Sequence, residues 1–227
     1  MSIKKKVASM VLVALAVAVM APQAMAVTPE VHPVEGGFPL KAAGLGSGAS
    51  LTTASTTISC TSGTGEGQAT NETTAEGSAV LHGCTGPLGA ACTTAGQPAG
   101  TIVIATSIAH LVYLDEAHTK VGSLTTPPAS GVFAKFTCLG IVVEVKGNGL
   151  LSEITAPKCG EKSKTGTTVA TSTSPGVQKY TQIEETGTVY KLESKTGGGE
   201  FVAASLDGTV TGTPEREFFL TCPGQHE

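Results

Sequence analysis

Alternating apolar and polar residues mark the middle of the chain. Between positions 141 and 146, Ile141, Val143 and Val145 fall on one face of an extended backbone, while Glu144 and Lys146 fall on the other. This period of two is typical of a half-buried β-strand, whereas apolar residues recur every three or four positions in an amphipathic helix. The pattern therefore predicts a strand here, and no window between residues 27 and 227 shows sustained helical spacing.

The same style of pattern predicts many more strands. A β-branched run over 101–114, a polar turn at 115–118 and a returning run over 119–124 are typical of a hairpin. Residues 62–77, rich in Gly and Thr, are expected to form an exposed loop or a weak hairpin. Further strands are expected at 51–59, 78–82, 132–138, 167–173, 177–183, 188–193, 200–206, 208–212 and 216–222. Many short strands with closely spaced Gly and Pro predict an all-β fold, a single antiparallel β-sandwich or flattened barrel.

The first 26 residues are organised like a bacterial secretory signal peptide. Three lysines at positions 4–6 precede an uncharged apolar run over 7–21, and an A-M-A cleavage motif ends at Ala26. The apolar run is shorter than the about 20 residues that a bilayer-spanning helix needs. We expect cleavage after Ala26, a secreted or envelope location and no membrane span after cleavage; an uncleaved anchor is the alternative. Residues 27–50, rich in Pro and Gly, are expected to be irregular, and 51–227 to form the all-β domain.

The cysteines predict a disulfide framework. All six lie beyond the predicted signal peptide, and an even number in an exported chain indicates disulfides. None has the C-x-x-C spacing of a redox motif or a zinc site. Sequential pairing is expected because neighbouring strands of an antiparallel sheet tend to be sequential. The expected pairs are Cys60 with Cys84, Cys92 with Cys138, and Cys159 with Cys222.

Composition argues against a nucleic-acid partner. The chain has 14 basic and 18 acidic residues, and three of the basic ones belong to the predicted signal peptide. Arg216 is the only arginine, although bidentate recognition of phosphate is mainly arginine chemistry. We therefore expect no nucleic-acid binding.

One short segment resembles a metal site. His110, Asp115, Glu116 and His118 are close in sequence, and imidazole with carboxylate groups can bind a divalent cation. A strand rises about 3.3 Å per residue, however, which separates His110 from the tip of the predicted hairpin. A solvated hairpin tip is the preferred interpretation, and no metal or cofactor is expected.

Motifs for catalysis are not found in the sequence. It contains neither a G-x-S-x-G nucleophile elbow nor a phosphate-binding P-loop. A Ser-His-Asp triad assembled from distant positions stays open, because such triads need no local motif. We predict no catalytic or cofactor-binding residues.

Four segments of the sequence stand out, C-T-T-A-G-Q-P-A-G-T-I-V at 92–103, L-V-Y-L-D at 111–115, T-K-V-G at 119–122 and F-A-K-F-T-C at 133–138. They resemble segments of secreted, β-rich, Thr/Gly-rich proteins with cysteines from high-GC soil bacteria. The resemblance covers about residues 51–154. It implies a secreted β-rich protein and brings no activity or site residues.

Together these features favour a non-enzymatic extracellular protein of a structural or binding kind, with an extracellular or envelope partner. A secreted hydrolase with a site assembled from distant strands is one alternative. An extracellular inhibitor or a ligand carrier is another.

Overall fold

The described chain is built almost entirely of strands. The computed structural model describes residues 28–183 and 187–223, so the predicted signal peptide at 1–26 lies outside the described residues. The strands are β1 (Glu30–Pro33), β2 (Leu40–Thr53), β3 (Thr57–Cys60), β4 (Ser62–Ala69), β5 (Thr74–His82), β6 (Cys92–Thr93), β7 (Ile102–Tyr113), β8 (Val121–Thr126), β9 (Val132–Cys138), β10 (Ile141–Gly147), β11 (Leu150–Ala156), β12 (Gly166–Ala170), β13 (Ser172–Ser174), β14 (Val177–Gln178), β15 (Leu192–Thr196), β16 (Val202–Pro214) and β17 (Phe218–Thr221). The predicted all-β class is confirmed.

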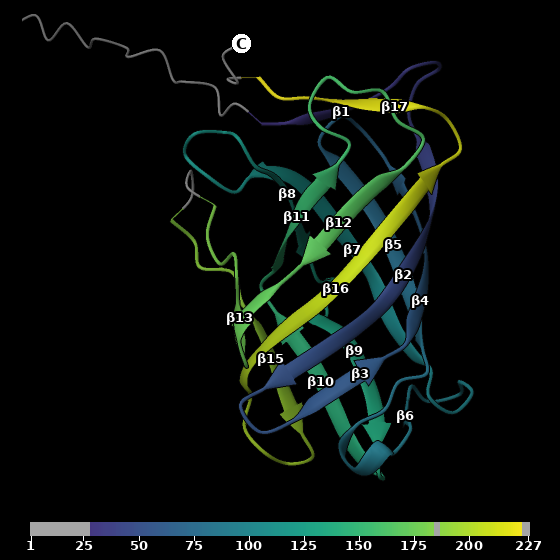
Figure 1. Ribbon diagram of the computed structural model, residues 1–227. Coiled ribbons are helices and arrows are strands. Elements are labelled where there is room, and N and C mark those ends of the chain that lie inside the picture. Colours follow the sequence, from purple (N-terminus) through teal and green to yellow (C-terminus); the bar gives the residue numbers. More distant parts are fainter. Residues whose placement is uncertain (1–27, 184–186, 224–227) are drawn as a thin grey trace, which may run out of the picture.

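Eight of these strands close into an antiparallel barrel. Their order is β2-β4-β5-β7-β8-β11-β12-β16, and β16 pairs back onto β2 (Figure 1). At the closure Val210 of β16 lies opposite Thr168 of β12 on one side and opposite Gly46 of β2 on the other. The antiparallel sheet is thus a barrel in which each of the eight strands has a neighbour on both sides.

One end of the barrel is closed by a hydrophobic floor. The sheet continues from β16 through β15, β10, β9 and β6, and β3 adds to the end of β2. β9 also contacts β7, so this extension folds back against the barrel. The floor is a cluster of buried side chains that includes Ile58, Ile102, Phe133, Phe136, Val145 and Leu192.

The other end is covered by a two-stranded ribbon of β1 and β17, here called the cap (Figure 1). Phe218 and Leu220 of β17 are 7% and 3% exposed. The backbone of β17 is also hydrogen-bonded to the segment after β11, because Gly160 N donates to Leu220 O and Ser163 N to Phe218 O. The cap is therefore fixed to the barrel by backbone bonds as well as by burial.

Three disulfides connect the chain, and the predicted sequential pairing is confirmed. They join Cys60 to Cys84, Cys92 to Cys138, and Cys159 to Cys222. The first two lie within the floor cluster. The third ties the end of the cap to the segment that follows β11.

Some predicted segments differ from the structure. Residues 27–50, expected to be irregular, contain β1 and most of β2. For 62–77, expected to be a loop or a weak hairpin, the hairpin is right, and its two strands are β4 and β5. The two runs at 200–206 and 208–212 form one strand, β16, whereas 177–183 holds only the short β14. β11 was not among the predicted strands. From Ala42 to Gly46 of β2 and along β4, the inward positions carry glycine and alanine rather than large apolar residues, so the period of two is hidden in the sequence there.

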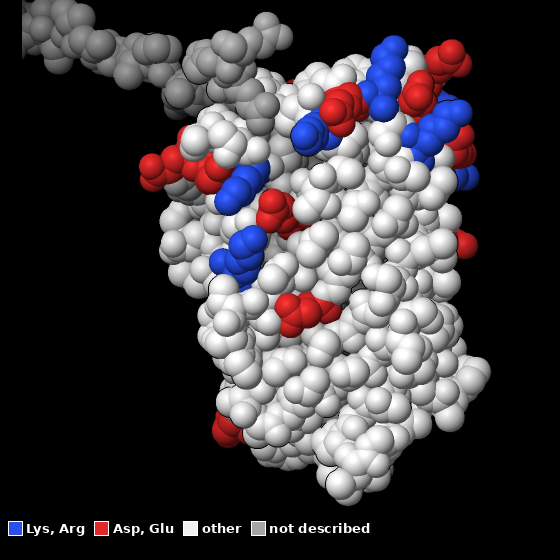
Figure 2. Space-filling model, in the orientation of Figure 1, with Lys and Arg blue, Asp and Glu red and all other residues white. Residues whose placement is uncertain are grey.

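Among the described residues, none forms a helix long and apolar enough to cross a membrane. Figure 2 shows that the charged side chains on one face gather toward the end of the barrel where the cap lies. Acidic and basic groups alternate there, so this face presents no continuous basic strip of the kind that follows a nucleic-acid backbone.

The only arginine of the sequence holds the loop between β1 and β2. Arg216 Nη1 donates to Glu35 O at 3.1 Å, and Nη2 donates to Gly37 O and Pro39 O, each at 2.9 Å. A planar guanidinium can reach several carbonyl groups at once, whereas a lysine ammonium on its flexible stem cannot reproduce that fork.

We expect Arg216→Lys to lower the free energy of unfolding by about 1 to 2 kcal/mol, because it loses hydrogen bonds made by a charged donor. Urea denaturation measures the change, with Lys41→Arg as a control at the same end of the barrel. If the free energy of unfolding of Arg216→Lys lies within about 0.3 kcal/mol of the wild-type value, the Arg216 hydrogen bonds do not hold this loop.

A loop packs on the outer surface of β8 and β11. Leu124 and Leu151, which point outward, are buried beneath Tyr180 and Tyr190. Tyr180 Oη donates to a Glu153 carboxylate oxygen at 2.7 Å, and Lys179 Nζ lies 3.4 Å from the same oxygen. These contacts, the Tyr180 hydrogen bond foremost, lower the pKa of Glu153.

Because the folded pKa of Glu153 lies below its unfolded value, this interaction stabilises the fold above the unfolded pKa and is lost as pH falls through the folded pKa. We expect Tyr180→Phe to lower the free energy of unfolding by about 1 kcal/mol at pH 7. Urea titrations at several pH values should show the difference from wild type shrinking in acid. A difference independent of pH would mean that the Tyr180 hydroxyl acts through another group.

Candidate binding cavity in the barrel

Small residues occupy the inward positions over half of the barrel wall. Along β2, Ala42, Gly44 and Gly46 point inward, while Ala43 and Leu45 point outward and are exposed. Successive residues of a strand face opposite sides, so the register carries this pattern to the neighbouring strands. The inward glycines on β4, β5 and β16 are Gly63, Gly65, Gly67, Gly77, Gly208 and Gly212.

Strand pairing explains some of these glycines and not others. A Cβ atom on Gly67 would lie 2.8 Å from Glu76 O, and one on Gly77 would lie 2.9 Å from Glu66 O, so β4 and β5 approach too closely for a side chain. A Cβ atom on Gly212 would meet nothing nearer than Gly166 O at 3.8 Å. There the space is open, and glycine is not required by its neighbours. Glycine inside a strand costs about 0.5 to 1 kcal/mol relative to alanine and often marks the approach of a ligand.

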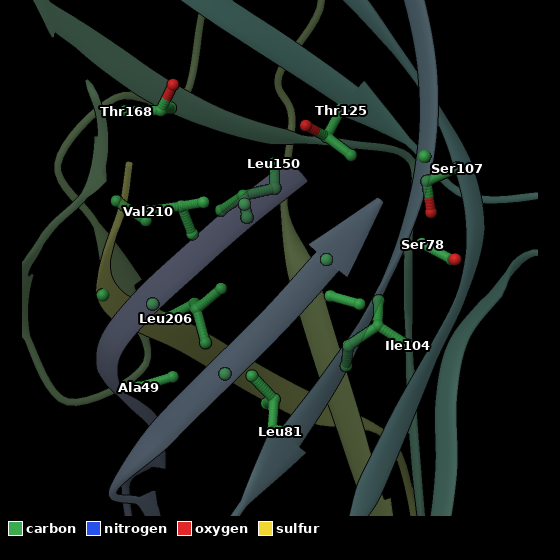
Figure 3. Close-up of a pocket in the computed structure, with 18 of the residues that line it drawn as sticks. Ala49, Ser78, Leu81, Ile104, Ser107, Thr125, Leu150, Thr168, Leu206 and Val210 are labelled. Atoms are coloured by element: carbon green, nitrogen blue, oxygen red, sulfur yellow. The ribbon is translucent and has the colours of Figure 1, made fainter. Parts of the chain in front are cut away.

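The result is a cavity of about 480 Å³ inside the barrel. Figure 3 shows Leu81, Ile104 and Leu206 in the lower part of the view, and Thr125 and Thr168 in the upper part. An eight-stranded barrel is just wide enough to be filled by side chains or to hold one small ligand. Here the side chains are too small to fill it.

Exposure of inward residues gives a second measure of the same space. Val210 points into the cavity (Figure 3), yet the residue is 50% exposed. A further cavity of about 300 Å³ lies beneath the cap and shares Val210, Ala42 and Ala109 with the first. The open interior therefore extends from the floor to Phe218 and Leu220 of the cap.

A group of hydroxyls interrupts the apolar lining on one side. Ser123 and Thr125 of β8, Ser152 of β11 and Thr168 of β12 line the cavity and are called the hydroxyl band. Ser123 and Ser152 are register partners, and Thr168 lies opposite Ile154, two residues beyond Ser152. Partners on one face lie about 5 Å apart and diagonal neighbours about 7 to 8 Å apart. The four side chains thus form one patch on three adjacent strands.

The inward positions of the eight barrel strands, as far as the structure describes them, carry no charged side chain. Glu66 and Glu76 border the cavity through their backbone, while their side chains lie on the outer surface, where Gln68 Nε2 donates to Glu76 Oε1 at 2.7 Å. Among the residues that the structure describes, no inward histidine or carboxylate faces the cavity serines to activate them as nucleophiles. The interior suits a neutral ligand.

The segment that resembled a metal site does not assemble one. His110 lies on the outer face of β7, with Nδ1 3.4 Å from Thr74 Oγ1, and the His118 ring stacks on Tyr113 with centroids 4.3 Å apart. The Asp115 carboxylate accepts hydrogen bonds from the backbone and side chain of Thr119 and from Lys120 N. Within the described ranges, no group of three or more His, Cys, Asp or Glu side chains could hold a metal ion.

Two pKa shifts accompany this turn. Burial alone would raise the pKa of Asp115, but the hydrogen bonds from Thr119 and Lys120 outweigh it and the pKa is lowered. Burial raises the pKa of Tyr113, whose hydroxyl donates to Pro223 O at 2.9 Å. Asp115 thus closes the β7–β8 turn as a charged acceptor, which is a structural role.

No family model matches the chain, and no curated protein or solved structure shows significant similarity to it. The resemblance to secreted proteins of soil bacteria stays a prediction.

Sequence reasoning missed the cavity residues altogether, because small and hydroxyl residues carry no motif. The signal that could have found them is the alternation of Gly and Ala at every second position of β2 and β4. That spacing gives a strand whose inner face has almost no side-chain volume.

We expect Ala109→Leu to raise the free energy of unfolding by about 1 kcal/mol, because the new side chain enters open space and buries apolar surface. Ala204→Leu provides the matched control. Ala204 is 2% exposed in the packed floor cluster, so overpacking should lower stability by about 1 to 3 kcal/mol. Chemical denaturation compares the two; equal losses would show that the barrel interior is already filled.

Proposed function

We propose that this protein is an extracellular carrier that binds one small, neutral, apolar molecule inside its barrel. The cavity is the observation on which the proposal rests. Protein interiors pack densely and leave few voids larger than a water molecule, whereas ligand pockets measure about 300 to 1,000 Å³ and are mostly apolar. An interior space of about 480 Å³ belongs to the second class.

The surroundings of the cavity support a carrier rather than an enzyme. The floor and the cap cover the two ends of the barrel, and an apolar interior shields a poorly soluble molecule from water. The described inward positions offer no acid or base beside the cavity serines. The rival proposal, a hydrolase, needs such a group.

Location outside the cytoplasm is part of the proposal. Three disulfides are typical of proteins that fold in oxidising compartments. The signal-peptide pattern at 1–26 supports the same location from the sequence.

The test uses two variants on one strand. Ala42 points into the cavity and its neighbour Ala43 points outward. Ala42→Phe therefore places a phenyl ring in the cavity, whereas Ala43→Phe leaves the cavity unchanged. Binding of N-phenyl-1-naphthylamine, a neutral apolar probe, is measured by its fluorescence. We expect saturable one-to-one binding to wild type, at least tenfold weaker binding to Ala42→Phe and no change in Ala43→Phe.

Two outcomes would overturn the carrier proposal. One is an absence of saturable binding to wild type, or equal binding to both variants. The other is turnover of ester, peptide or glycoside substrates by the pure protein, which would favour the hydrolase.

A further inference from the structure

We infer that the ligand carries a neutral hydrogen-bonding group, such as a hydroxyl or a carbonyl, that contacts the hydroxyl band. This inference rests on the proposed carrier function and specifies the chemistry of its ligand. The cavity wall is divided, with glycine and alanine over β2, β4, β5 and β16 and hydroxyls over β8, β11 and β12.

The hydroxyl band has unused hydrogen-bonding capacity. Among the described residues, Ser123, Thr125, Ser152 and Thr168 make no side-chain hydrogen bond to another protein group. Ser107, also inward on β7, differs because its Oγ donates to Ala105 O at 2.9 Å. Ser152 is only 6% exposed, so its hydroxyl faces the cavity and not the outer solvent.

A ligand that covered these hydroxyls without bonding to them would bind at a cost. Serine and threonine each have one donor and two acceptor sites, and shutting such a group off from water without a hydrogen bond costs about 1 to 3 kcal/mol. Alanine or valine at these four positions would complete an apolar interior. A ligand that both donates and accepts hydrogen bonds satisfies the hydroxyl band, whereas a plain hydrocarbon does not.

The lack of charged groups on the described inward positions argues against a charged ligand. A carboxylate or ammonium group transferred to an apolar interior needs an opposite charge. The described inward positions provide none, so an anionic or cationic group at the hydroxyl band would be unpaired. The inferred ligand is therefore an apolar body with a neutral polar group.

The geometry also orients the ligand. The hydroxyl band begins on the cap side, where Ser123 and Thr168 also line the cavity beneath the cap. It ends at Thr125, which pairs with Leu150 of the floor side. Leu81, Ile104 and Leu206 line the floor side (Figure 3). The polar group of the ligand should thus face β8 and β11, with its apolar body toward the floor.

Three aromatic ligands of one shape test this inference. Naphthalene, 2-naphthol and 2-naphthoate share a rigid frame and differ in carrying no polar group, a neutral hydroxyl or a charged carboxylate at pH 7. Their affinities are measured by displacement of N-phenyl-1-naphthylamine and by calorimetry, with wild type and two double variants. The inward variant is Thr125→Val with Thr168→Val, and the matched outward control is Thr126→Val with Thr167→Val.

We expect the inward variant to bind 2-naphthol about tenfold more weakly than wild type, which is the loss of one to two hydrogen bonds, and to bind naphthalene no more weakly. The outward control should bind both as wild type does, and 2-naphthoate should bind wild type at least tenfold more weakly than 2-naphthol. Thermal melting of each variant shows whether it is folded; if the inward variant is not, Ser152→Ala replaces it, with an expected loss of about threefold.

Distinct outcomes separate the two proposals. If naphthalene and 2-naphthol bind wild type and lose affinity in parallel in the inward variant, the role of the hydroxyl band is wrong and the carrier function stands. Tight binding of 2-naphthoate would also overturn the inference. If none of the three ligands binds wild type, the carrier proposal itself fails.

Discussion

Closure of the barrel through the pairing of β16 with β2 is the constraint from which the rest of the structure follows. Gly212 and Val210 face Gly44 and Gly46 across this seam, so the two ends of the sheet meet where the inner face is smallest. An open sheet with so little side-chain volume on one face would have no core to pack against. Closed on itself, the same sheet encloses a space, and the floor, cap and disulfides serve to seal it.

The sequence was sufficient to predict the features that depend on local pattern. Strand β10 was predicted from the alternation of Ile141, Val143 and Val145. The β7–β8 hairpin was predicted from the polar turn at Asp115. The predicted disulfide pairing was also right, although Cys84, Cys159 and Cys222 lie outside the strands and the bridged cysteines are 24, 46 and 63 residues apart. Barrel closure did not follow, because the β16–β2 pairing joins segments from opposite ends of the chain and no local signal encodes it.

The cavity could not be predicted for a related reason. A segment such as β2, with Gly and Ala at alternate positions, looks like a flexible lead-in when it is judged by hydrophobicity. It becomes a strand because its backbone hydrogen bonds to β4 and β16 are satisfied on both sides. Stability at the inward positions of β2 and β4 thus comes from the ladder and from the floor, and the space left over is available for binding.

The two sides of the cavity wall differ in what they can adjust. Glycine and alanine have no side-chain torsions to change, so the surface over β2, β4 and β5 keeps the curvature that the backbone gives it. On the other side, Leu150, Ser152 and Thr125 each have at least one side-chain torsion. A bound molecule therefore contacts a surface of fixed shape over β2, β4 and β5 and a surface with rotatable side chains over β8 and β11. Selectivity for the shape of the ligand would come from the first surface.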